Sequence, residues 1–169
     1  YQRRKLDAAK QGLAQTTDQI GQVLEMAHYE ADTLHGQRVI FYVTGDTNII
    51  ETYREGLFEG PYRLFYEDGA LKQEGQYQNN ELVGIWRAYH ENGQLKEEVR
   101  FENNEENGPF IEYHPNGKLA AEGSYLDGDN EHGELKIYDE QGELLRSMIC
   151  DKGRCRTTWS AETPETTKE

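Results

Sequence analysis

The sequence predicts an all-β fold, namely a single-layer, elongated and twisted antiparallel sheet of stacked β-hairpin repeats, preceded by one N-terminal α-helix. Three observations support this prediction. Glycines recur at Gly60, Gly84, Gly108 and Gly133, at intervals of 24, 24 and 25 residues, and such an internal period is typical of stacked repeat proteins. Aromatic residues and leucines stand at fixed distances after each of these glycines. Only 35% of the residues are hydrophobic, which suits a sheet without a second layer.

Each repeat has the residues expected of a β-hairpin. The dipeptides Asp68-Gly69, Asn92-Gly93 and Asn116-Gly117 separate segments rich in strand-forming aromatic residues, and Asx-Gly favours a type I′ turn. We expect the leading glycine at the second bend, where the chain enters the next hairpin. Aromatic residues stand two and five positions after the leading glycine. Because this spacing is odd, alternation cannot place both on one face, so we expect a bulge or strong coiling in that strand.

The repeats divide the chain into three parts. Residues 35–159 hold about five hairpin repeats, with weaker copies beginning at Gly36 and Gly133. Residues 1–34 form the N-terminal part, which contains the predicted helix. Residues 160–169 consist mostly of Thr, Glu, Pro and Lys, which predicts a disordered tail.

The predicted helix covers about residues 5–29. This segment has no proline, and Leu6, Leu13 and Ile20 recur every seven residues, as in an amphipathic helix. Either the helix packs on the first hairpin and caps the open sheet edge, or it forms a short stalk with weak self-association. Because the chain begins at Tyr1 rather than Met, we expect that a signal peptide or membrane anchor is missing from its N-terminus.

Two cysteines flank a short turn near the C-terminus. Four residues, including Lys152-Gly153, separate Cys150 from Cys155, so a tight turn would bring the two sulfurs together across a hairpin. A disulfide would indicate an oxidising compartment and hence a periplasmic or envelope-associated protein. The alternative is a pair of free thiols in a cytoplasmic protein.

The charge of the chain restricts its partners. It has 32 acidic and 18 basic side chains and a formal net charge of −14. Nucleic-acid binding requires clustered Lys and Arg, and an anionic lipid surface would repel these repeats. We therefore expect a protein partner of basic character, and neither nucleic acid nor direct lipid binding.

The sequence indicates no enzyme, cofactor or metal site. His90 and His114 occupy equivalent repeat positions, roughly 10 Å apart across two strands, which is too far for two ligands of one zinc ion. Asp127, Asp129 and Glu131 lack the remaining positions of a calcium loop. The repeated glutamates, too, lack the cleft that a glycosidase needs; they are Glu74, Glu98 and Glu122.

The repeat pattern G-x-W-x-x-Y-x-x-x-G-x-L-x-x-E-x-x-Y, present in residues 60–133, resembles the MORN-repeat family. The bacterial variant found in YwqK-type antitoxin proteins is the most similar. The resemblance covers about residues 36–155. It implies a sheet of stacked hairpins that serves as a non-enzymatic scaffold or binding surface, in some proteins within a toxin–antitoxin or immunity system.

These observations predict an interaction module that binds a protein partner through an acidic, tyrosine-rich sheet face, as an antitoxin, immunity or envelope assembly protein. Aromatic side chains provide contact area at low entropic cost. The alternative is a carbohydrate- or cell-wall-binding module, because flat aromatic strips also stack on sugars. The predicted strip of exposed or half-exposed rings consists of Tyr62, Tyr66, Trp86, Tyr89, Phe110 and Tyr113.

Overall fold

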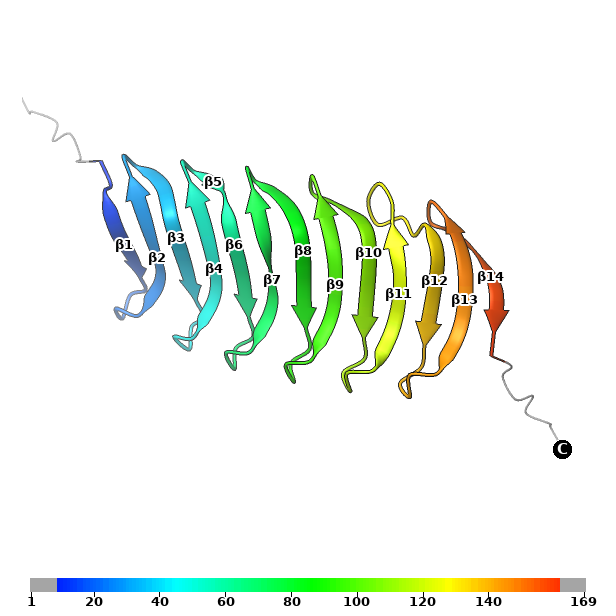
Figure 1. Ribbon diagram of the computed structural model, residues 1–169. Coiled ribbons are helices and arrows are strands. Elements are labelled where there is room, and N and C mark those ends of the chain that lie inside the picture. The colour runs from blue at the N-terminus through cyan, green and yellow to red at the C-terminus, as the bar shows by residue number, and fades with distance from the viewer. Residues whose placement is uncertain (1–8, 162–169) are drawn as a thin grey trace, which may run out of the picture. The chain divides into compact units, whose positions relative to one another are not determined.

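A computed structural model describes residues 9–161, and the fold of this part is all-β (Figure 1). Residues 9–161 form fourteen strands joined by short turns, and strands that neighbour each other within a compact unit pair antiparallel. The chain divides into two compact units, residues 1–81 and 82–169. No helix long and apolar enough to cross a membrane is found among residues 9–161.

The first unit is a single-layer sheet in which strands follow one another in chain order. Its order is β1-β2-β3-β4-β6-β7, and the two-residue strand β5 pairs with β4. The strands are β1 (Gly12–Thr17), β2 (Val23–Glu30), β3 (Thr33–Phe41), β4 (Thr47–Arg54), β5 (Leu57–Phe58), β6 (Gly60–Phe65) and β7 (Leu71–Gln78).

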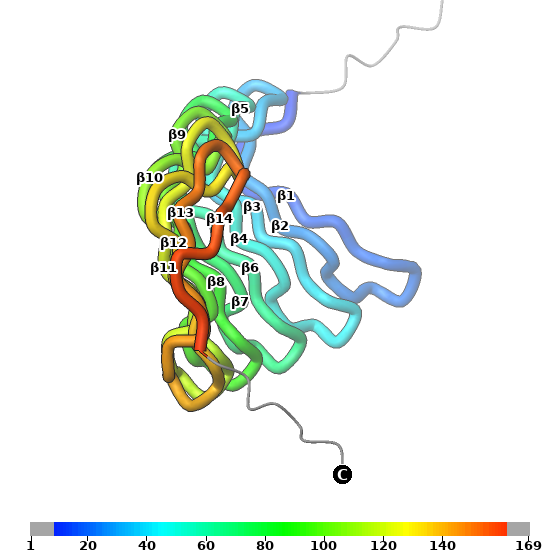
Figure 2. Tube along the Cα trace, turned by 90° about the vertical axis from the view of Figure 1, so that its right-hand side faces the viewer, coloured from blue at the N-terminus to red at the C-terminus, as the bar shows by residue number. Residues whose placement is uncertain are grey.

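The second unit has the same construction and the order β8-β9-β10-β11-β12-β13-β14. In Figure 2 its hairpins lie one behind another as bent traces, from green to red. The strands are β8 (Glu81–Tyr89), β9 (Leu95–Glu102), β10 (Glu105–Tyr113), β11 (Leu119–Tyr125), β12 (Gly133–Tyr138), β13 (Leu144–Asp151) and β14 (Arg154–Ser160).

The predicted N-terminal helix is wrong. Between residues 9 and 34 the chain forms β1, a turn, β2 and the start of β3. Gly12 lies 24 residues before Gly36, and Gly21 follows Gly12 by nine residues, as Gly45 follows Gly36. This segment is therefore a further copy of the hairpin repeat.

The apolar residues of the predicted helix do not form a buried stripe. Leu13 is 52% exposed and Ile20, in the turn after β1, is 87% exposed. Leu6, the third member of the stripe, lies outside the described residues. The weak self-association assigned to this helix therefore has no structural basis in the part of the chain that is described.

The type I′ turns predicted at the Asx-Gly dipeptides are not found there. Turns of this type lie instead at the other ends of the strands. At Asp68-Gly69 only the glycine has positive φ, and the loop is closed by bonds from Tyr66 N to Ala70 O and from Gly69 N to Tyr66 O. This pattern is a type I turn followed by a left-handed glycine. Two consecutive positive φ angles, as type I′ requires, occur instead at Asn79-Asn80 (50° and 69°) and Asn103-Asn104 (52° and 68°).

The leading glycine of a repeat belongs to a strand rather than to a bend, either as its first residue, as Gly60 and Gly133 do, or in its interior. Gly84 belongs to β8 and Gly108 to β10, with φ angles of 72° and 103°. The register between β9 and β10 shifts between Glu106 and Phe110, so Gly108 lies in an irregular part of the ladder. The bulge expected between the second and fifth positions is confirmed, because the β8–β9 register shifts between Ala88 and Tyr89.

Cross-strand pairs form the core of the second unit. Trp86 pairs with Val99, and Phe110 pairs with Gly123. The Trp86, Val99 and Phe110 side chains are only 3 to 5% exposed. Since alternate residues of a strand point to opposite faces, these pairs define a core face, and the residues between them define an outer face. A single sheet thus buries a row of side chains on one face.

A polar network replaces part of this core in the first unit. Arg38 donates hydrogen bonds to Glu25 (2.8 Å) and to Glu51 (3.1 Å), and the Tyr53 hydroxyl donates to Glu51 (3.0 Å). Glu51 is 7% exposed, and a carboxylate this buried needs compensating donors. Burial and the charge of Glu51 raise the pKa of Tyr53 to about 12.

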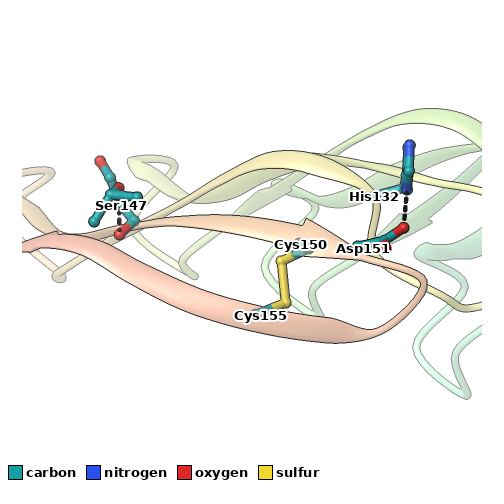
Figure 3. The surroundings of a disulfide bond; sticks show 6 residues. His132, Ser147, Cys150, Asp151 and Cys155 are labelled. Atoms are coloured by element: carbon teal, nitrogen blue, oxygen red, sulfur yellow. Dashed lines mark hydrogen bonds and ion pairs between the residues drawn. A yellow bond between two sulfur atoms is a disulfide. The ribbon is translucent and has the colours of Figure 1, made fainter.

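The structure confirms the predicted disulfide between Cys150 and Cys155, which are directly opposite each other on β13 and β14 (Figure 3). The turn between them has positive φ at Lys152 and Gly153. Cys150 is 2% exposed, whereas every residue of β14 is exposed. Ser160, the first residue of the predicted tail, ends β14, and residues 162–169 lie outside the described part.

Candidate functional site

The structure divides the six predicted strip residues into two groups. Trp86 and Phe110 are 3% and 5% exposed, so the prediction that they are exposed or half-exposed is wrong. Both pack in the core, where the Trp86 ring lies 6.0 Å from Phe101 and the Phe110 ring stacks 4.3 Å from Tyr125, measured between centroids. Burial also removes these two rings from the surface on which the carbohydrate-binding alternative relied.

The four predicted tyrosines are half-buried, so each presents part of its ring to solvent. Tyr62 packs edge-on against Tyr77, with 5.8 Å between the ring centroids. Tyr113 also lines a groove of the second unit. The four half-buried tyrosines of the predicted strip are Tyr62, Tyr66, Tyr89 and Tyr113.

This groove, which we call the tyrosine groove, lies where β8 and β10 end and encloses about 470 Å³. Its walls combine two carboxylates, an ammonium group, two imidazoles and a phenol. The polar residues that line it are His90, Lys96, Glu97, Glu112, Tyr113 and His114.

Two glutamates face each other in the tyrosine groove. Glu97 on β9 and Glu112 on β10 are direct cross-strand partners, and like charges in this relation destabilise a sheet. Burial, and then the neighbouring charge of Glu97, raise the pKa of the Glu112 carboxyl, while Lys96 acts in the opposite direction. The pair is a local electrostatic cost that the fold itself does not require.

The sequence contained a signal for these two residues that the repeat analysis missed. Glu97 and Glu112 stand 13 and four residues after their leading glycines. In the first unit the corresponding cross-strand pair is Ile49 and Leu64. Glu97 and Glu112 thus replace residues that are apolar in the first unit, and this difference could have identified the two glutamates from the sequence.

The two histidines connect neighbouring hairpins. His90 Nε2 lies 2.8 Å from the Tyr113 carbonyl oxygen, and His114 Nε2 lies 3.1 Å from the Tyr138 carbonyl oxygen. A carbonyl only accepts, so Nε2 carries the proton in both rings. Tyr42 forms the equivalent bond in the first unit, from its hydroxyl to Phe65 O (2.6 Å). No group of three or more His, Cys, Asp or Glu side chains placed to hold a metal ion is found within residues 9–161.

The glutamates considered for glycoside hydrolysis lie on the outer face in ion pairs. Glu98 lies 2.7 Å from Arg87, and Glu74 lies 3.8 Å from Arg63. Glu122 accepts a hydrogen bond from the Tyr138 hydroxyl at 2.7 Å. One of the two aspartates considered for a calcium loop, Asp127, lies 3.6 Å from Lys152.

These features define an array of stacked β-hairpins whose repeats are held together by recurring side-chain bonds. Three consecutive stretches of the chain, residues 58–79, 82–103 and 106–127, match the MORN repeat variant. The match concerns the repeat and gives no support for the finer assignment to YwqK-type antitoxins. No curated protein matches the chain.

Proposed function

We propose that this chain is a non-enzymatic repeat scaffold that binds a basic protein partner through the tyrosine groove of its second unit. The observation that carries the proposal is the Glu97–Glu112 pair, two carboxylates held opposite each other beside Tyr113. A Lys or Arg side chain of a partner would neutralise this pair. The repulsion that is present in the free protein would then be relieved in the complex.

The remaining walls of the groove suit the same partner. Tyr113 is half-buried and offers an aromatic surface, over which a cationic side chain is attracted. The net charge of −14 would steer a basic partner toward the chain and repel acidic proteins. His90 and His114 are fixed by their bonds to the next hairpin, so the groove walls are preorganised for binding.

Two biological settings fit a scaffold of this kind. One is an antitoxin or immunity protein that holds a basic toxin, and the other is an assembly factor of the cell envelope. The Cys150–Cys155 disulfide supports a periplasmic or envelope-associated location, because such bonds persist in oxidising compartments.

The proposal is tested by comparing the proteins captured from a native extract by the wild-type chain and by a Glu97→Gln/Glu112→Gln variant. A Glu67→Gln/Glu140→Gln variant is the matched control, because it makes the same change of charge at two exposed turn residues. We expect a basic protein that the wild type and the control retain equally and the groove variant retains about tenfold less, equivalent to about 1.4 kcal/mol. Equal retention by all three proteins would contradict the proposal.

A further inference from the structure

A second groove lies on the outer face of the second unit, on the opposite side of the sheet from Trp86 and Val99. It encloses about 460 Å³, and we call it the outer groove. The apolar part of its lining includes Ile85 on β8 and Pro109 and Ile111 on β10, and the core residues Phe110 and Gly123 also border it. Ile111 is the cross-strand partner of both Glu98 and Glu122, so an apolar side chain lies between two carboxylates.

The apolar lining is unusual for its position. The face of an antiparallel sheet that is directed to solvent normally carries polar residues. Ile85 is nevertheless 40% exposed. Ile111 likewise stands at a position where the preceding repeat has a charged residue, Arg87. These apolar residues add nothing to the core on the other face.

The charged lining of the outer groove has too few cations. The side chains of Glu98, Glu122, Glu134 and Lys136 give it a formal charge of −2. Glu98 has Arg87 as a close partner at 2.7 Å. Glu122 and Glu134 share one cation, the ammonium group of Lys136, at 3.8 and 3.3 Å, and Glu122 also accepts the hydrogen bond from the neutral Tyr138 hydroxyl. A cation from outside the chain would balance this shared arrangement.

We propose that the outer groove binds an extended segment of a protein partner that carries an apolar side chain next to a Lys or Arg. The apolar side chain would cover Ile111 and Pro109, and the basic side chain would approach Glu122 and Glu134. The lining extends from β8 to β12. Four strand spacings of about 4.8 Å give about 19 Å, which is the length of about six extended residues. This surface is separate from the tyrosine groove.

The test uses a fluorescent six-residue peptide of alternating Leu and Lys, with alternating Ser-Lys and Leu-Glu peptides as controls, and measures binding to the full chain by anisotropy. We expect the Leu-Lys peptide to bind at least about tenfold more tightly than either control. Ile111→Thr, which keeps a β-branched residue in the strand, should weaken its binding severalfold. Glu122→Gln should weaken it by a similar factor.

Two further variants make the result specific to this groove. Glu140→Gln, at an exposed turn, changes the net charge as Glu122→Gln does and should leave the affinity unchanged. The proposal is overturned if Glu122→Gln and Glu140→Gln weaken binding equally. It is overturned as well if the Leu-Lys peptide binds no better than the Ser-Lys peptide. It is also overturned if only Glu97→Gln weakens binding, a result that would instead support the tyrosine groove.

Discussion

Replacing Gly123 with Ala should destabilise the second unit, because the Phe110 ring lies directly over this glycine. A Cβ added at residue 123 would lie 2.8 and 2.9 Å from two Phe110 ring carbons and 3.1 Å from Leu135 Cδ1. Carbon atoms in optimal contact are about 3.5 to 4.0 Å apart, so the ring would have to move by more than half an ångström in a packed core.

Opposing effects set the magnitude. Overpacking of a core typically costs about 1 to 3 kcal/mol, whereas removing a glycine from a strand interior gains about 0.5 to 1 kcal/mol. Taking the middle of each range, we expect Gly123→Ala to lower the free energy of unfolding by about 1 kcal/mol, measured by urea denaturation.

A double-mutant cycle attributes this loss to the ring. Phe110→Leu shortens the side chain that meets the new methyl group, so Gly123→Ala should cost at least about 0.5 kcal/mol less in the Phe110→Leu background than in the wild type. If Gly123→Ala leaves stability unchanged or raises it, the packing argument for this core pair fails.

Two further predictions concern the disulfide and the polar network. The cysteines of the Cys150–Cys155 bond are five residues apart, so its reduction should lower the free energy of unfolding by about 2 kcal/mol through loop-closure entropy. Amide exchange in β14 should become faster, and unchanged exchange there would contradict this prediction. Arg38→Met should lower stability at neutral pH by about 2 to 3 kcal/mol, because the buried Glu51 carboxylate then loses its cationic partner and keeps only the hydrogen bond from the Tyr53 hydroxyl. Arg38 holds the pKa of Glu25 below its usual 4.5, a contribution present above pH 4.5 and lost as the pH falls further. Urea denaturation at several pH values should therefore show the gap between wild type and Arg38→Met narrowing in acid, and a gap that is independent of pH would refute this account.

The hairpin array was predictable from the sequence, whereas its N-terminal copy was missed for a physical reason. In the central repeats the positions two and five residues after the leading glycine hold aromatic residues such as Trp86 and Tyr89. In the first copy the same positions hold Ala14 and Thr17. Without its aromatic residues the copy retains mainly the glycine spacing, and the accidental heptad of Leu6, Leu13 and Ile20 then indicated a helix.

Which aromatic residues are buried could not be decided from the repeat pattern. In a single-layer sheet the burial of one residue depends on its cross-strand partner, as with Trp86 and Val99. That partner is set by the turns and bulges, and the turn types themselves were assigned to the wrong ends of the hairpins. The sequence marks Glu97 and Glu112 only as acidic residues at positions that are apolar in other repeats. That the two meet in the tyrosine groove follows from the register of β9 and β10, because they belong to different repeats.

The bonds from Tyr42, His90 and His114 to the next hairpin each span 23 or 24 residues, which makes the length of the repeat a constraint on how such a chain can evolve. Loss of a single residue within a strand would separate a side chain from its carbonyl and turn core residues outward. The 25-residue repeat accommodates its extra residue in the loop between β11 and β12, which a bond from Leu126 N to Asn130 O helps to close. Homologous chains should therefore differ in length by whole hairpins or by insertions and deletions in loops of this kind, and not by single residues within strands.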